Sequence, residues 1–130
     1  MNERFARWWP AIVWAGLIEV ATSWPNPPIP AGLPEQSDKV VHTTMYAVLG
    51  FLVARALARP GARLASMLRG LAVVAAISGF GALDEWHQRF IPGRGVELGD
   101  WMADTTGGLL GVLLFTFMAG VIIARRNSRK

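Results

Sequence analysis

The chain has 130 residues, of which 52% are hydrophobic and 17% are charged, and its mean hydropathy is +0.34. This length allows one domain at most, and so apolar a composition is typical of a small multi-pass membrane protein and not of a soluble domain. The absence of cysteine excludes disulfides, a thiol nucleophile and a thiolate metal site. The net charge of +4 would suit a nucleic acid, but the distribution of the basic residues, described below, argues against that partner.

The first half of the chain predicts two helices separated by a proline-rich loop. Residues 8–24 are mostly apolar, and because Glu19 interrupts them we interpret the segment as a retained first helix and not as a cleaved signal peptide. Five prolines within residues 25–34 exclude a helix there and favour an extended loop. Ser37 then offers an N-cap for a second apolar helix over residues 40–57.

The second half predicts two further helices. The uninterrupted apolar run 70–83 has 14 residues, fewer than the roughly 20 that a membrane span requires. We therefore expect a third helix over 67–88, with a polar end that faces protein or water instead of lipid. A fourth helix is expected over 100–124. Its Gly107 and Gly111 form a G-x-x-x-G face for close helix contact, which is also a candidate surface for a homodimer.

The basic residues predict the topology. With both termini in the cytoplasm, ten of the thirteen lysines and arginines lie on the cytoplasmic side, as the positive-inside rule requires. The sequence therefore predicts an all-α, four-helix transmembrane bundle, a single domain over residues 1–130, in a bacterial plasma membrane. Because topology explains the positive charge, a nucleic-acid partner is set aside. The ten residues are Arg4, Arg7, Arg55, Arg59, Arg63, Arg69, Arg125, Arg126, Arg129 and Lys130.

This topology brings polar residues of three helices to the outer face of the membrane. Lys39, His42 and Tyr46 stand at i, i+3 and i+7 and share one face of the second helix. The second and fourth helices also point their N-termini to this side, which favours an anion. The other polar residues expected here are Asp38 beside that stripe, Asp84, Glu85 and Gln88 at the end of the third helix, and Asp100 and Asp104 at the start of the fourth.

These residue types suit two kinds of chemistry. Carboxylates crowded on one face can act as general acids or bases, or can share a hard divalent cation such as Mg²⁺. Lys39 and Arg94 supply positive charge for a phosphate, such as that of a lipid headgroup. We expect Asp84, Glu85 and His42 to be catalytic or to hold the cation. The expected substrate-binding residues are Asp38, Lys39, Tyr46, Gln88, Arg94, Asp100 and Asp104.

Simpler interpretations stay open for the same residues. Asp38 and Asp100 are also explained as helix caps. Glu85 and Arg89, at i and i+4, are also explained as a surface ion pair, and His42 as a buried histidine with a structural hydrogen bond. Each signal is weak alone, but together they favour a functional site over a purely structural network.

Three motifs in this part of the chain resemble those of one known family. They are Asp38-Lys39-x-x-His42-x-x-x-Tyr46, Asp84-Glu85-x-x-Gln88-x-Phe90-x-Pro92-Gly93-Arg94 and Asp100-x-x-x-Asp104-x-x-Gly107. In this order they are similar to the VanZ-like family. The resemblance implies a multi-pass membrane protein, with a founding member linked to low-level resistance to the glycopeptide teicoplanin. The family usually has asparagine where this chain has Asp104, and a carboxylate, unlike an amide, only accepts hydrogen bonds.

The leading functional hypothesis is that the outer polar site acts on or binds an envelope lipid or a lipid-linked anionic substrate. A relation to teicoplanin susceptibility is implied by the resemblance alone, and whether the protein is an enzyme stays open. One alternative is a non-catalytic module that binds such a lipid or modulates a partner protein. Another is a small transporter or proton relay in which Glu19, within the first helix, carries the proton.

Overall fold

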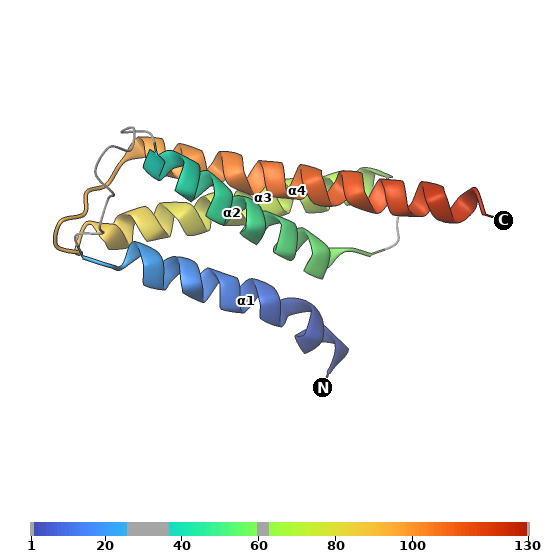
Figure 1. The fold of residues 1–130 in the computed structure, drawn as a ribbon, viewed down its shortest axis with the longest axis horizontal. Coiled ribbons are helices and arrows are strands. Elements are labelled where there is room, and N and C mark those ends of the chain that lie inside the picture. The colour runs from blue at the N-terminus through green and yellow to red at the C-terminus, as the bar shows by residue number, and fades with distance from the viewer. Residues whose placement is uncertain (1, 26–36, 60–62, 130) are drawn as a thin grey trace.

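A computed structural model describes residues 2–25, 37–59 and 63–129 as four long helices (Figure 1). Successive helices run in opposite directions, so the two termini lie at the same end of the bundle. The C-terminal ends of α1 and α3 and the N-terminal ends of α2 and α4 lie together at the other end. The prediction of an all-α, four-helix fold is confirmed. The helices are α1 (Glu3–Thr22), α2 (Ser37–Leu57), α3 (Arg63–Gln88) and α4 (Leu98–Asn127).

The observed helices are longer than the sequence indicated. Helix α1 begins at Glu3, capped by the Asn2 side chain, which accepts a hydrogen bond from the Arg4 backbone N–H at 3.1 Å. Helix α3 has 26 residues and continues through its polar end to Gln88. Its full length therefore suffices to span a membrane, although its uninterrupted apolar run is short. The proline-rich segment 25–34 lies almost entirely outside the described residues.

Three of the helices, α2, α3 and α4, are long and apolar enough to cross a membrane. Large hydrophobic side chains are exposed on the outer faces of the bundle, as expected for surfaces that contact lipid. Helix α1 has 20 residues but also carries Glu3, Arg4, Arg7 and Glu19. It does not reach the same apolar content, so its crossing of the membrane stays a prediction.

Helices α2 and α4 make the most extensive helix–helix contact in the described structure. A side chain on Gly107 or Gly111 would overlap the backbone carbonyl oxygens of Thr43 and Ala47 in α2. Both glycines are buried. The expected close approach of a neighbouring helix is therefore made by α2 of the same chain. The homodimer surface suggested by this glycine pair is corrected accordingly, because α2 already covers it.

Helix α1 packs mainly on α2 and only weakly on α3. The Trp14 indole Nε1–H donates a hydrogen bond to the Met45 backbone carbonyl at 2.8 Å. Ile18, one turn further along, is buried in the same core as Tyr46 and Leu49 of α2. This contact places the C-terminal end of α1 beside the ends of α2 and α3, while its N-terminal end lies apart from the other helices (Figure 1).

Candidate functional site

The end of the bundle opposite the termini gathers most of the buried polar side chains in the described structure. We call it the polar end. The three residues expected to be catalytic, Asp84, Glu85 and His42, are all buried there. Among the expected substrate-binding residues, Tyr46, Gln88, Asp100 and Asp104 are also buried, while Asp38, Lys39 and Arg94 are partly exposed at its rim. Residues far apart in the sequence thus form one network.

Asp84 connects three helices. Its side chain is fully buried, and its Oδ1 accepts a hydrogen bond from the Thr22 hydroxyl of α1 at 2.7 Å. Its Oδ2 accepts one from the Tyr46 hydroxyl of α2 at 3.2 Å. Sequence reasoning did not find Thr22, although a threonine at the end of an otherwise apolar helix was the available signal. The two hydroxyl donors compensate part of the cost of burying this carboxyl group.

His42 lies between two aspartates of α4. Its Nδ1 is 2.9 Å from Oδ1 of Asp104, and its Nε2 is 4.0 Å from Oδ2 of Asp100, beyond hydrogen-bonding distance. The other oxygen of Asp104, Oδ2, is buried and has no hydrogen-bond partner among the described residues. A Cβ atom on Gly81 of α3 would lie 2.9 Å from that oxygen, so the glycine makes room for the carboxyl group.

Glu85 is held from two sides. Its Oε2 accepts a hydrogen bond from the backbone N–H of Glu97 at 2.9 Å, and its Oε1 accepts one from Nε2 of Gln88 at 3.3 Å. The surface ion pair with Arg89, one of the simpler interpretations, is wrong. The Arg89 guanidinium instead stacks on the rings of Trp86 and Phe90, with centroid distances of 5.0 Å and 4.6 Å.

Lys39 forms ion pairs with three carboxylates at the rim. Its Nζ is 2.9 Å from Asp100 Oδ1, 3.0 Å from Glu97 Oε2 and 3.3 Å from Asp38 Oδ2. The capping role proposed for Asp100 is wrong, because Glu97 occupies the N-cap position of α4 and Asp100 lies in the first turn. Lys39 therefore balances acidic groups of the protein at the rim, and its role in binding a substrate stays a prediction.

Arg94 folds back onto α1. Its Nη2 donates a hydrogen bond to the Ala21 backbone carbonyl at 3.3 Å. The turn that precedes it contains Gly93 with φ of 77°, a conformation that residues with a side chain rarely adopt. Arg94 thus ties the segment after α3 to the C-terminal end of α1, close to Thr22.

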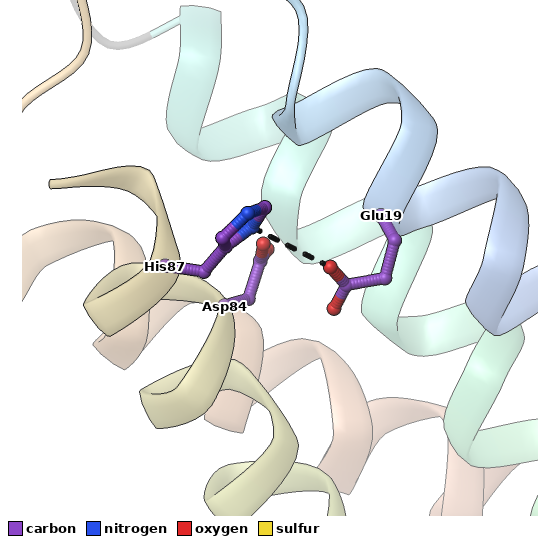
Figure 2. Close-up of side chains that lie close together, drawn as sticks. All are labelled: Glu19, Asp84 and His87. Atoms are coloured by element: carbon purple, nitrogen blue, oxygen red, sulfur yellow. Dashed lines mark ion pairs between the residues drawn. The ribbon is translucent and has the colours of Figure 1, made fainter. Parts of the chain in front are cut away.

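Asp84 also belongs to a second cluster, which joins α1 to α3 and includes Glu19 and His87 (Figure 2). Glu19 of α1 and His87 of α3 point toward each other, with Oε2 of Glu19 3.7 Å from Nδ1 of His87. Both side chains are about 40% exposed, at 39% and 43%. Sequence reasoning gave His87 no role, and Glu19 here lies with His87 and Asp84 at the polar end.

Three groups of side chains in the described structure place potential metal ligands together. In each, one nitrogen or oxygen atom per residue lies within 4.8 Å of the others. Only His42, Glu85 and Asp104 are all buried. The group of Asp38, Glu97 and Asp100 surrounds the Lys39 ammonium, and the third group is Glu19, Asp84 and His87.

A cleft of about 320 Å³ opens between α3 and α4 beside Glu85. Its other polar lining residues are Arg89 and Glu97, and its walls include Trp86 and Trp101. Tryptophan near the end of a membrane-spanning helix is typical of the membrane–water interface. A larger cavity of about 540 Å³ lies toward the terminal end, and its lining includes none of the buried polar residues.

A protein-family model described as VanZ/LLP1 matches residues 4–119. The chain belongs to the VanZ/LLP1 family. The match includes every residue of the polar end named above, and together with three helices suited to crossing a bilayer it identifies a multi-pass membrane protein. Comparisons with curated proteins and with solved structures gave no match.

Asp104 is where this VanZ/LLP1 protein departs from the asparagine that the sequence resemblance leads us to expect. An asparagine amide there would present one acceptor and one donor group to its surroundings. The carboxyl group instead presents two acceptor oxygens, of which Oδ1 contacts His42 and Oδ2 has no partner among the described residues. The departure therefore changes both the charge and the hydrogen-bonding capacity of the site.

Proposed function

We propose that this VanZ/LLP1 protein binds the phosphate-bearing headgroup of an envelope lipid or of a lipid-linked precursor in the cleft between α3 and α4. The supporting observation is the position of Glu85. It lines the cleft on one side and belongs to the buried network on the other. A ligand in the cleft would therefore contact Glu85 and, through it, the buried polar network. Burying ionisable groups in a membrane protein costs much free energy, and such groups usually have a function.

The composition of the cleft suits an amphipathic ligand. Trp86, Trp101, Val96 and Leu98 provide apolar walls for the glycerol or prenyl part of a lipid. Arg89 provides the positive charge, and its stacking on Trp86 holds the guanidinium plane in position. A stacked guanidinium donates hydrogen bonds from its edge, the geometry that suits phosphate oxygens.

Glu85 is the proposed acid–base group, because it alone of the three expected catalytic residues lines the cleft. Its carboxylate is oriented by Gln88 and by the backbone of Glu97. His42 and Asp84 lie behind it, held by Asp104 and by two hydroxyl groups, and would position the network. Binding without turnover is the alternative, with the same cleft acting only in recognition.

Native mass spectrometry of the purified protein tests the binding step. The probes are phosphatidylglycerol and a polyprenyl phosphate, with phosphatidylcholine as the zwitterionic reference. Arg89→Gln is expected to weaken binding of the phosphate lipids about tenfold, equivalent to roughly 1.4 kcal/mol. Arg126→Gln, at the terminal end of α4, is the matched control and should change it little. Equal losses in the two variants would contradict a site in the cleft.

A second measurement separates an enzyme from a binding module. The same lipids are incubated with the protein in nanodiscs, and ³¹P NMR follows any change in their phosphate groups. An enzyme predicts turnover by the wild type that Glu85→Gln abolishes while lipid binding is retained. Binding without turnover in the wild type would establish the recognition role.

The proton-relay alternative is tested with Glu19→Gln in a transport assay. This variant should leave lipid binding intact, and it should lose proton transport if Glu19 carries the proton.

A further inference from the structure

We infer that the buried group formed by His42, Glu85 and Asp104, here called the inner triad, is a binding site for one divalent cation of the Mn²⁺ or Zn²⁺ class. The three residues come from α2, α3 and α4, so the site forms only where these helices meet. One potential ligand atom of each lies within 4.8 Å of the others. The residues are 4%, 3% and 0% exposed, which makes the triad part of the interior and not a solvated acidic surface.

An unpartnered oxygen provides the second, independent observation. Oδ2 of Asp104 is buried and accepts no hydrogen bond from the described residues. A buried acceptor without a partner costs about 1–3 kcal/mol, and more when the group is charged. A cation bound by the triad would give this carboxyl group the compensation that its described neighbours do not provide. Gly81 leaves the space on α3 that the carboxyl group needs.

The balance of buried charge leads to the same conclusion. Four carboxyl groups are buried at the polar end, those of Asp84, Glu85, Asp100 and Asp104, with one imidazole. Lys39 pairs with Asp100, and two hydroxyl groups contact Asp84. Among the described residues, the two carboxyl groups of the triad have no basic neighbour other than His42, because the two donors to Glu85, the Gln88 amide and the Glu97 backbone N–H, are neutral. Two negative charges in a low-dielectric interior match one divalent cation.

The donor set favours a transition metal over Mg²⁺. Mg²⁺ prefers oxygen ligands and retains its waters, whereas imidazole suits Zn²⁺ and carboxylates suit Mn²⁺, so one imidazole nitrogen with two carboxylates can hold either of these two metals. Ligating carboxylates are usually held by further hydrogen bonds. Glu85 has two of these, from Gln88 and from the Glu97 backbone, and each of its oxygens keeps a second lone pair.

The other two potential ligand groups fit a cation less well. The group of Asp38, Glu97 and Asp100 already contains a cation, the Lys39 ammonium. In the group shown in Figure 2, Glu19 and His87 are about 40% exposed, whereas all three residues of the inner triad are buried. The inner triad is therefore the proposed site.

The position of Glu85 gives the cation a role. Because Glu85 also lines the cleft, a metal on the triad would lie next to a phosphate bound there and could bind its oxygens as a Lewis acid. This part of the inference rests on the proposed function. The site itself rests on its ligands alone, so the two can be tested separately.

Mn²⁺ is the probe for the test, since its binding is followed directly by EPR. EDTA-treated protein in detergent is titrated with Mn²⁺, and Zn²⁺ is added in competition. The wild type should show one saturable site. Glu85→Gln and Asp104→Asn should weaken it at least tenfold. Glu97→Gln, which removes a carboxylate of the Lys39 group but keeps the backbone N–H that contacts Glu85, is the matched control and should stay within about twofold.

Spin-echo spectroscopy of bound Mn²⁺ in the wild type provides a readout that does not depend on any variant folding correctly. A ¹⁴N coupling from a directly bound imidazole is expected, and it should disappear in His42→Gln while persisting in His87→Gln. The inference is overturned by the absence of saturable binding in the wild type, by an equal loss in Glu97→Gln, or by a spectrum without nitrogen coupling.

Lipid binding measured with and without EDTA separates this inference from the proposed function. Phosphate-lipid binding in the cleft with no Mn²⁺ site overturns the cation inference and leaves the lipid proposal standing. A Mn²⁺ site that meets the criteria above, without binding of any phosphate lipid, supports the cation and contradicts the lipid proposal.

Discussion

Asp104 is a fully buried residue whose carboxyl group is only partly compensated by its described neighbours. It is fully buried, one of its oxygens contacts His42, and the other has no partner. Asp84 is equally buried, yet both of its oxygens accept hydrogen bonds. The two aspartates are equally buried, but we expect them to contribute to stability with opposite sign. Asp84 connects helices through two hydrogen bonds, whereas Asp104 has a buried oxygen without a partner among the described residues, as is common at functional sites.

This contrast predicts opposite effects of the same substitution. In metal-free protein, Asp104→Asn should leave the free energy of unfolding unchanged or raise it, because it removes a buried charge. Asp84→Asn should lower it by about 1–3 kcal/mol, because two hydroxyl groups lose a charged acceptor. Thermal unfolding in detergent compares the two. A loss of several kcal/mol for Asp104→Asn would show that Asp104 belongs to a structural network.

Thr22 provides a second test at the same scale. Thr22→Val keeps the shape of the side chain and removes the hydroxyl that donates to Asp84. We expect it to reduce stability by about 1.5–3 kcal/mol, the value for a hydrogen bond to a charged group. Thr106→Val is the matched control, because that hydroxyl is exposed and donates only to the Met102 carbonyl of its own helix. Equal effects of the two changes would contradict the connection between α1 and α3.

At the scale of helices, α2 and α4 form the pair on which the site is built. They approach so closely that a side chain on Gly50, Gly107 or Gly111 would meet backbone atoms of the other helix. Backbone cannot move aside as a flexible side chain can. This contact determines the positions of His42, at the start of α2, and Asp104, at the start of α4, relative to each other.

The α2–α4 contact predicts a strong position dependence for glycine substitutions within α4. Gly107→Ala should separate the helices and cost about 1–3 kcal/mol, as expected for overpacking. Gly120→Ala, in the same helix but with open space around it, should be neutral or stabilising by up to about 1 kcal/mol. Thermal unfolding measures both. The Gly107 variant should also bind Mn²⁺ more weakly, because it shifts Asp104 from His42.

At the scale of the whole molecule, alternating helix directions give the bundle two chemically different ends. The polar end contains the buried carboxylates, and the terminal end contains Arg125 and Arg126 in the last turn of α4. Positive residues favour the cytoplasmic side. We therefore expect the polar end to face outward, as the proposed function requires.

Cysteine accessibility tests this orientation, since the chain has no cysteine of its own. A thiol introduced at Gly95, exposed between α3 and α4, should react with a membrane-impermeant maleimide on intact spheroplasts. A thiol introduced at Ser128, beyond α4, should react only after the membrane is permeabilised. Both should react fully in detergent, which controls for reactivity. The reverse pattern would place the polar end in the cytoplasm and contradict the proposed envelope site.

The sequence was informative where a local rule applies. Helical spacing placed Lys39, His42 and Tyr46 on one face, and the glycine pair predicted a close helix contact. Hydropathy predicted four helices, although only three are apolar enough to span a membrane on that basis. These features depend on periodicity and composition, which can be read without knowing the tertiary structure.

Contacts between distant segments could not be predicted in the same way. Thr22 meets Asp84 across 62 positions of sequence, and no local pattern links them. Arg89 stacks on Trp86 and Phe90 instead of pairing with Glu85, because Glu85 is turned inward to the backbone N–H of Glu97, just before α4. Gly81 gave no signal at all, since its role depends on the size of a side chain from another helix.

The convergence of four helices on one polar network also constrains how the protein is made. When α3 is inserted during synthesis, Thr22 and Tyr46, the partners of Asp84, have already been made, but the Glu97 backbone N–H that donates to Glu85 is still to be translated. Glu85 is therefore expected to stay in water or in the insertion machinery until that segment follows, because exposing its carboxyl group to hydrocarbon is costly. The segment that leads into the final helix thus completes the hydrogen bonding of the helix before it, and we expect a nascent chain that stops after α3 to be less stable in the membrane than the full chain.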